Sequence, residues 1–513
     1  MPDRMEVSAL GRLIQEFIAE ARHGVLVEDG EILFDLSESR FSIATEDGRC
    51  VLHFWSHERN CVRRVMDAEG KGAMLRLTVQ RLGRPRATHL EIWRDRDRRS
   101  PSTKRTQRAT YERQLEKALL RNFPGFRVAK PKSSMDLERS FGPVCARGVI
   151  HRGVSAYAVV GINTEELQAS IDGALTIGLL WLDYLREREA GRKHVAGLKL
   201  FVPAKRSDMV RERIAHLNRE AASFELYEFN QREDTIESID TEDRGNIDTH
   251  LMPCPNETGA LERFATSIAR VRDIAPDCDV AVISPSEISF RIFGLEFAHA
   301  RMSGSIHGGT EIVFGVGPTE TVLSPDSEEL FREIVRRLLQ SRRPGGPHPG
   351  DPLWRLAPER WLESLIVRDV SAIDHRLDPS WTYSQVPAFT ASDRAMIDVL
   401  TTSKDGRLAV LELKADEDLH LPMQGLDYWA RVKWHHARKE FQKFGYFSGV
   451  ELSEQPPLLY LVAPALRIHP TTDKLLRYFS PEIEWQLVAV NEDWREKIEV
   501  VFRKRANNFF MSN

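Results

Sequence analysis

The chain has 513 residues, of which 42% are hydrophobic and 29% are charged, and its net charge is −4. This near-neutral balance excludes a histone-like nucleic-acid binder but permits local basic patches. Because single hydrophobic cores rarely grow beyond ~250–300 residues, the length predicts several domains. We expect a multidomain α/β protein that mixes helices with both parallel and antiparallel strands (mixed α+β). The expected domains cover residues 1–105, 106–230, 257–341 and 352–513.

The sequence indicates a cytoplasmic protein without membrane association. Its five cysteines are scattered and form no CxxC pair, which argues against a zinc site or a disulfide framework and suits a reducing compartment. The N-terminal segment carries charges where a signal peptide needs an apolar run. The most apolar helix candidate, residues 174–182, is too short to cross a bilayer.

Residues 1–100 predict a helix followed by short strands, and a basic segment then begins. Between Arg76 and Arg108 there are eleven Lys/Arg residues against three Asp/Glu. A solvated connector is the favoured interpretation of such a segment. The alternative is a strip that contacts phosphates, for which the candidate nucleic-acid-binding residues are Arg94, Arg98, Arg99, Lys104 and Arg105.

The rest of the chain falls into three parts. Residues 111–229 predict a helix–strands–helix–strand–helix–strand pattern, and the acidic stretch 230–248 predicts a linker. Residues 257–341 predict a small domain that starts with a helix, continues as strands and closes on an amphipathic helix. The Pro- and Gly-rich run at 341–352 marks the clearest boundary, and one compact α/β domain follows it.

Three charged residues interrupt a predicted hairpin of otherwise apolar strands in this last domain: Asp398, Glu412 and Lys414. Glu412 and Lys414 are two residues apart, so they share one face of their strand. A two-residue turn would pair Asp398 with Leu413, whereas a three-residue loop ending at Gly406 would pair it with Glu412. Burying an unpaired carboxylate costs several kcal/mol, so we expect the second register.

Two facing carboxylates beside a lysine suit a hard divalent cation such as Mg²⁺, with Mn²⁺ as a substitute. Such an ion can activate water and stabilise the charge that develops on a phosphodiester. The lysine can orient or deprotonate the attacking water, or neutralise the phosphate. An ordinary surface salt bridge of Lys414 with Asp398 or Glu412 is the alternative interpretation of these residues.

The flanking helices carry further polar residues. Downstream, Gln424, Tyr428, Arg431 and His435 recur at i, i+4, i+7 and i+11 and predict a polar stripe on one helix face. Alternatively, Tyr428 is a core aromatic and the histidines face solvent. Upstream, an amphipathic helix carries Glu363.

This order of residues resembles the PD-(D/E)xK nuclease superfamily, in particular the RecB-like branch with its QxxxY motif, over roughly residues 355–495. The resemblance implies a restriction-endonuclease-like core, a mixed central sheet flanked by helices, and Mg²⁺-dependent cleavage of DNA. It also implies catalytic roles for Lys414, Gln424 and Tyr428 and metal ligation by Asp398, Glu412 and Glu363. No proline precedes Asp398, a position that varies in the family. Arg431 and His435 lie outside the motif and are candidate DNA contacts.

The segment 111–229 shows the same order of predicted elements as the last domain, which predicts a degenerate second copy of that fold. In this comparison Gly161 and Asn163 replace Glu412 and Lys414, so the copy would hold no catalytic ion. The favoured function is a metal-dependent deoxyribonuclease of repair, restriction or defence. The alternatives are a nucleic-acid-binding protein with a structural or inactive nuclease domain, and an RNA-directed nuclease.

Overall fold

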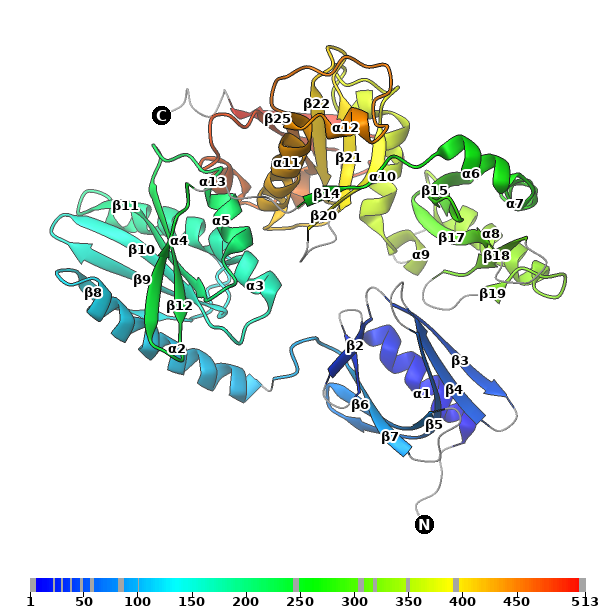
Figure 1. The fold of residues 1–513 in the computed structure, drawn as a ribbon, viewed down its shortest axis with the longest axis horizontal. Helices are drawn as coiled ribbons and strands as arrows, with labels where there is room; N and C mark the ends of the chain where they lie inside the picture. Colours follow the sequence, from blue (N-terminus) through cyan, green and yellow to red (C-terminus); the bar gives the residue numbers. More distant parts are fainter. Residues whose placement is uncertain are drawn as a thin grey trace. The chain divides into compact units, whose positions relative to one another are not determined.

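The computed structural model describes residues 6–21, 24–28, 31–36, 39–46, 49–55, 60–81, 87–99, 101–242, 249–302, 309–316, 321–346, 351–390 and 396–506. The chain divides into two compact units (Figure 1). The first unit comprises residues 1–100, 257–292 and 296–337, and the second comprises 101–256, 293–295 and 338–513. Several sheets with intervening helices confirm the mixed α/β, multidomain class.

The first unit contains a seven-stranded antiparallel sheet in the order β2-β1-β7-β6-β5-β4-β3 and a five-stranded sheet in the order β15-β16-β17-β18-β19. Helix α1 (Val7–Glu20) packs on the larger sheet, because Leu10, Ile14 and Phe17 recur at helical spacing and are buried. The other elements are β1 (Val25–Glu28), β2 (Glu31–Asp35), β3 (Arg40–Glu46), β4 (Arg49–Trp55), β5 (Asn60–Lys71), β6 (Met74–Arg81), β7 (Ala87–Trp93), α6 (Glu257–Arg263), α7 (Ala265–Arg272), β15 (Asp279–Ser284), β16 (Glu287–Ile292), β17 (Leu295–Met302), β18 (Thr310–Phe314), β19 (Thr321–Val322) and α8 (Glu328–Ser341), which continues into the second unit.

The basic segment between Arg76 and Arg108 is not the connector that its charge suggested. It contains β6 (Met74–Arg81), β7 (Ala87–Trp93) and the first turns of α2 (Pro101–Asn122). Some of its cations are paired within the sheet, as in the 2.8 Å contact of Arg76 with Glu91. The prediction of a connector from charge composition was wrong, because alternate residues of β6 and β7 are apolar and buried.

The second unit contains two sheets with the same topology. The first repeat consists of α2, β8 (Arg127–Lys132), β9 (Cys145–Arg152), β10 (Ser155–Ile162), α3 (Gln168–Asp172), α4 (Ala174–Glu189), β11 (His194–Pro203), α5 (Asp208–Ile214), β12 (Ser223–Asn230) and β13 (Thr235–Ile239). The second repeat consists of α9 (Pro352–Arg355), α10 (Pro358–Arg368), a 3₁₀ turn (Val370–Ala372), β20 (Tyr383–Thr390), β21 (Met396–Thr402), β22 (Leu408–Leu413), α11 (Leu421–Ala437), α12 (Glu440–Lys443), β23 (Leu458–Pro464), a 3₁₀ turn (Ala465–Arg467), α13 (Thr472–Leu476), β24 (Trp485–Val490) and β25 (Val500–Arg505).

Strand order and direction agree between the repeats. Each sheet has two antiparallel pairs at one end, then two parallel pairs, and an antiparallel edge strand at the other end. The strand orders are β8-β9-β10-β11-β12-β13 and β20-β21-β22-β23-β24-β25. This agreement supports the predicted second copy of the fold. The acidic stretch 230–248 was wrongly expected to be a linker throughout, since β13 closes the first sheet there; residues 243–248 lie outside the described part. A further strand, β14 (Thr249–Leu251), joins the second sheet beside β20.

A backbone bridge joins the two repeats in a symmetric way. The Asn218 N–H donates to the Tyr478 carbonyl (2.8 Å), and the Ser480 N–H donates to the His216 carbonyl (2.9 Å). These four residues follow the equivalent helices α5 and α13, so exchanging the repeats turns one hydrogen bond into the other. The repeats therefore pack around a local twofold relation within one chain.

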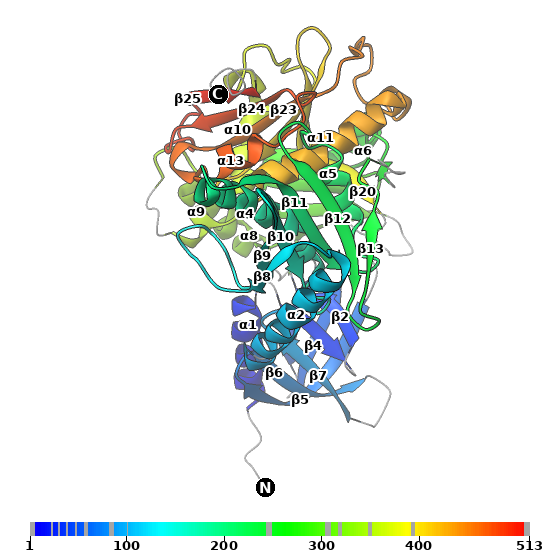
Figure 2. The same cartoon turned by 90° about the vertical axis from the view of Figure 1, so that its left-hand side faces the viewer.

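Salt bridges and apolar packing follow the same relation. Arg213 of α5 donates to Asp427 of α11 from Nε (2.9 Å) and Nη2 (2.7 Å), and Lys474 of α13 contacts Asp183 of α4 at 2.9 Å. Figure 2 shows α11 alongside α5. Buried residues of both repeats belong to one continuous hydrophobic cluster. Each repeat thus supplies part of the core of the other.

A glycine in each crossover helix allows close packing on the sheet. A Cβ at Gly425 of α11 would lie 2.4 Å from Leu461 Cδ2 and 3.6 Å from Glu412 Cβ. A Cβ at Gly178 of α4 would lie 2.7 Å from Leu198 Cδ2. Helix α11 therefore lies directly over the strand that carries Glu412.

We expect Gly425→Val to lower the thermal unfolding midpoint of the full chain, with a loss of about 1–3 kcal/mol, because the added side chain overpacks the contact with β23. Gly178→Val should act similarly in the first repeat. Gly142→Ala is the matched control, since a Cβ there meets nothing within 4 Å. Unchanged midpoints for both valine variants, measured by circular dichroism, would contradict the close packing of the helices.

Candidate functional site

The register of the β21–β22 hairpin agrees with the prediction. Val399 lies opposite Leu411, and continuing this pairing places Asp398 opposite Glu412. The loop turns at Gly406 with φ +80°, a backbone conformation that glycine adopts without strain. The alternative register, which would shift Asp398 by one residue, is not formed.

The strand face that carries Glu412 does not face solvent. β22 lies between β21 and β23, and both of its faces are covered. One face packs with residues of α10 in one apolar cluster, whereas the other lies beneath α11. Glu412 is consequently only 1% exposed. A two-residue alternation predicted which face carries the acid, but it could not show that a helix covers that face.

The buried Glu412 carboxylate has a polar partner for only one of its two oxygens among the described residues. Its Oε1 lies 3.1 Å from Lys414 Nζ, but its Oε2 is buried and has no hydrogen-bond partner in the described part of the protein. Burial first, and then the charge of Asp398, raise the pKa of Glu412 well above its usual value. The surroundings therefore disfavour the ionised form of this carboxylate unless a further cation is present.

Lys414 lies among carboxylates. Its Nζ is 3.1 Å from Glu412, 3.9 Å from Asp418 and 4.0 Å from Glu359, and its side chain is 13% exposed. Burial lowers the pKa of Lys414, but the charges of Glu412 and Glu359 raise the pKa by a larger amount, so the net shift is upward. The charged ammonium is thus favoured, which suits a role in orienting water or neutralising phosphate better than a role as base.

Gln385 of β20 is a site residue that sequence reasoning missed. Its Nε2 donates to Glu363 Oε2 of α10 (2.8 Å) and to Asp398 Oδ1 (3.3 Å), so it connects the two acids. Gln385 has φ +51°, a left-handed conformation that is uncommon for a residue other than glycine. The second oxygen of Asp398 accepts the backbone N–H of Leu413 (3.0 Å).

Glu363 lies close to this group but is held by neighbours. Its Oε2 also accepts Nη1 of Arg360 (2.9 Å), one turn earlier on α10, and its side chain is 7% exposed. The structure thus connects Glu363 to Asp398 through Gln385. A role as outer metal ligand stays a prediction.

Helix α11 brings the two residues of the QxxxY motif to the same region. The Gln424 Oε1 is buried without a hydrogen-bond partner in the described residues, and Gln424 directly precedes the glycine that packs near Glu412. Burial and then the charges of Glu412 and Asp398 raise the pKa of Tyr428 above its usual value. Tyr428 is therefore a neutral hydroxyl close to the carboxylate pair.

Arg431 and His435, expected to contact DNA, are buried instead. Arg431 is 3% exposed and donates to the Ala388 carbonyl (3.3 Å). His435 is fully buried, with Nδ1 2.5 Å from Glu440 Oε2 and Nε2 3.1 Å from Thr249 Oγ1. Strand β14 and helix α12 cover this end of α11, and neither element was predicted from the sequence.

The basic candidates Arg94, Arg98 and Arg99 belong to the first unit, whereas Lys104 and Arg105 lie on α2 of the second. Arg94 is 2.6 Å from Glu20, and Arg99 is 2.8 Å from Asp97, so both are paired. Contact of this set with phosphates stays a prediction.

The first repeat lacks the carboxylates. Strand pairing places Val160 where the second repeat has Glu412, and the cross-strand partner Arg147 where it has Asp398. Gly161, which the sequence comparison placed at this position, faces α2 instead. The alignment was one residue off, because the sequence alone gives no strand pairing. The first repeat still presents no acid at this position.

The residues of the second repeat fit a hard divalent cation. Two carboxylates face each other, and the described residues offer no hydrogen-bond partner to Glu412 Oε2 or Gln424 Oε1. Within the described residues, no group of three or more His, Cys, Asp or Glu side chains has an arrangement that would hold a metal ion. Mg²⁺ commonly uses only one or two carboxylates and completes its shell with water and phosphate oxygens.

Comparisons with known proteins give little. No protein-family model and no curated protein matches the sequence. Among solved structures, a chain of the complex titled "Structure of EndoMS-dsDNA2 complex" aligns with 12% identity over 44% of this chain and 98% of that chain. Its TM-score of 0.17 is too low to support a conclusion on fold or function. Among the described helices, none combines the length and apolar composition that a membrane crossing needs.

We expect Glu412→Gln to raise the thermal midpoint in EDTA at neutral pH, because the amide removes a buried charge that its surroundings disfavour. Mg²⁺ or Mn²⁺ should raise the midpoint of the unmodified chain but not that of the variant. Differential scanning fluorimetry with a metal titration measures both effects. An equal metal-induced rise in the two proteins would show that the ion binds elsewhere.

Proposed function

We propose that this chain is a metal-dependent nuclease that hydrolyses DNA phosphodiester bonds. The observation that carries the proposal is the facing Asp398–Glu412 pair. The buried Glu412 lies beside the ammonium of Lys414 and keeps one carboxylate oxygen without a hydrogen-bond partner among the described residues. An ordinary surface salt bridge does not account for it, because Glu412 is 1% exposed and its surroundings disfavour its charge. The geometry agrees with the resemblance of these residues to the PD-(D/E)xK superfamily.

Asp398 and Glu412 would hold the Mg²⁺ ion, with Glu363 acting through Gln385. When bound, the ion supplies activation of water and stabilisation of charge on the phosphodiester. Lys414 contributes a fixed positive charge that can hold the attacking water or a phosphate oxygen. Gln424 contributes an amide oxygen that has no partner in the described part of the chain and can accept a water hydrogen, and Tyr428 contributes a hydroxyl donor.

DNA is the favoured substrate because of the family resemblance, since Mg²⁺ chemistry alone does not select the sugar. An RNA-directed nuclease therefore remains the second candidate. A nucleic-acid-binding module with an inactive nuclease domain is disfavoured, because the carboxylates, the lysine and the QxxxY side chains gather in one region of the second repeat. In the first repeat, Arg147 and Val160 replace the acids, so the proposal assigns one working site to each chain.

We expect cleavage of circular single-stranded, circular duplex or linear DNA to require Mg²⁺ or Mn²⁺, and to be abolished by Asp398→Ala, Glu412→Ala or EDTA. Lys414→Ala should reduce the rate at least about 100-fold, because it removes charge stabilisation at the reacting phosphate. Gel electrophoresis with each substrate, and with matched RNA, measures the outcome. Circular substrates separate internal cutting from cutting at ends.

Asn163→Ala in the first repeat is a control outside the candidate site and should leave cleavage unchanged, although strand pairing places Ile162 rather than Asn163 at the position of Lys414. Full activity in EDTA, or in either carboxylate variant, would reject the proposed site. Equal losses from Asn163→Ala and Lys414→Ala in folded proteins would mean that both repeats contribute chemistry.

A further inference from the structure

A cavity of about 400 Å³ opens beside the candidate site, at the carboxyl ends of the parallel strands. It is lined by residues that follow β22, end or follow β23, follow β24, and lie at α9 and the start of α10: Trp354, Arg355, Pro358, Ala415, Asp416, Pro464, Arg467, Glu492, Trp494 and Arg495. This edge is where open α/β sheets bind ligands, and the volume falls within the ~300–1,000 Å³ of small-molecule pockets.

Arg495 is the central charged group of this cavity. Its guanidinium carbon lies 4.2 Å from the ring centre of Trp494 and 5.0 Å from that of Trp354. Its Nε is buried without a hydrogen-bond partner, and it makes no ion pair with any residue that the structure describes. Burial lowers the pKa of Arg495. The charge of Asp416, which also lines the cavity, opposes this lowering, but Asp416 forms no ion pair with Arg495. A half-buried guanidinium without a direct ion pair among the described residues favours an anion in the cavity.

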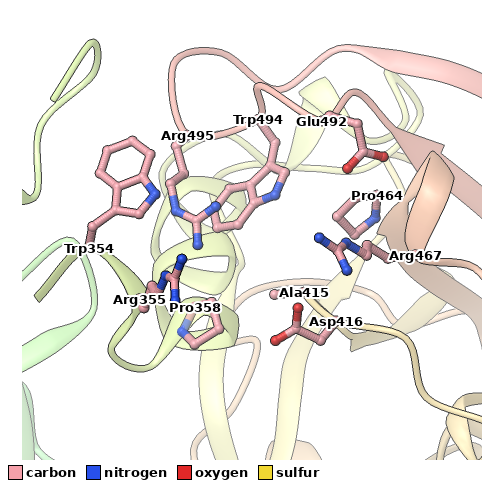
Figure 3. A pocket seen from close by; sticks show the side chains of 10 residues that line it. All are labelled: Trp354, Arg355, Pro358, Ala415, Asp416, Pro464, Arg467, Glu492, Trp494 and Arg495. Atoms are coloured by element: carbon pink, nitrogen blue, oxygen red, sulfur yellow. The ribbon is translucent and has the colours of Figure 1, made fainter. Parts of the chain in front are cut away.

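The other charges leave the cavity cationic. Figure 3 shows the guanidiniums of Arg355 and Arg495 on one side and that of Arg467 on the opposite side. Arg467 makes no ion pair within the described residues. Of the two acids, Glu492 is engaged by the backbone N–H of Leu466 (2.7 Å). The cavity thus holds three guanidiniums and two carboxylates. Of its two indole rings, that of Trp494 is 2% exposed and that of Trp354 is partly exposed, so phosphate binding and stacking on Trp354 are combined in one space.

The cavity is continuous in sequence with the candidate site. Ala415 and Asp416 directly follow Lys414, and Pro358 directly precedes Glu359, which lies 4.0 Å from Lys414 Nζ. A polymer whose phosphate reaches Lys414 therefore places a neighbouring unit at the mouth of the cavity. Successive phosphates and bases of a nucleic acid supply the anion and the aromatic surface that the cavity suits.

We propose that this cavity binds one unstacked nucleotide of the DNA strand that reaches the candidate site, with its base against Trp354 and its phosphate on Arg467 and Arg495. The inference rests on the proposed function, because it takes the ligand to be the substrate strand. It goes beyond that function in assigning a base-binding subsite to residues outside the PD-(D/E)xK motif. A free mononucleotide has the same chemistry and is the competing source of ligand.

The test measures binding of a short fluorescein-labelled single-stranded oligodeoxynucleotide to the full chain in EDTA, by fluorescence anisotropy. A second probe has the same length and phosphates but carries abasic residues throughout. We expect Trp354→Leu to weaken binding of the normal strand about tenfold, a typical stacking contribution, and to leave the abasic strand unchanged. Arg467→Gln should weaken both strands alike, because it removes a phosphate contact. Unlabelled dAMP should compete much less well than the unlabelled strand.

Arg438→Gln is the matched control, since Arg438 also lies over an indole ring (Trp434, 3.2 Å to its centre) but outside the cavity. It should bind both probes as the unmodified chain does. Equal losses of both probes in Trp354→Leu would overturn base binding, and normal binding by Arg467→Gln would overturn the phosphate contact. If Trp354→Leu does not fold, equal affinity of the unmodified chain for the normal and the abasic strand would overturn base binding, and the variant of the exposed Arg467 still tests the phosphate contact.

Two outcomes separate this inference from the proposed function. Cleavage that needs Asp398 and Glu412, with no effect of the cavity variants on binding, would reject the cavity alone. Absence of both DNA binding and metal-dependent cleavage in the unmodified chain would reject the proposed function and the inference with it. If dAMP competes as well as the unlabelled strand at the same concentration, the ligand of the cavity is a free nucleotide and not the strand.

Discussion

The pairing of two strands buried on both faces controls the candidate site. A shift of one residue between β21 and β22 would place Asp398 and Glu412 on opposite faces of the sheet. Gly406 permits the loop that sets this pairing, and Gly425 permits α11 to lie directly over it. The two carboxylates are therefore brought together beneath a helix, where water cannot fully solvate them and where a cation would relieve their repulsion.

The hairpin could be predicted because one energy dominated the choice of register. An unpaired buried carboxylate costs far more than the difference between two turn types. The burial of Arg431 and His435 could not be predicted in this way, since it depends on β14, a segment more than a hundred residues away in the sequence. Gln385 also escaped prediction, because no sequence pattern signals a left-handed glutamine within a strand. Periodicity within a strand or helix was informative, whereas contacts between distant segments were not.

The repeats differ in chemistry but share their packing. The first repeat has Arg147 and Val160 at the positions of the acids, yet its residues complete the hydrophobic cluster that surrounds α11. Helix α11 carries Gln424 and Tyr428, so the first repeat supports the candidate site without contributing a reacting group. Packing alone thus explains why the first repeat keeps its topology. The candidate metal site needs only the acids of the second repeat.

The symmetric backbone bridge near Asn218 and Tyr478 has a consequence for how the two halves change over time. In a dimer of identical chains, a single substitution alters both subunits at once, and the pairing weakens on dilution. Here both halves belong to one polypeptide, so their association does not depend on protein concentration. Each half can also acquire substitutions that the other does not share. The fold can therefore lose its acids on one side while keeping an intact partner surface on the other.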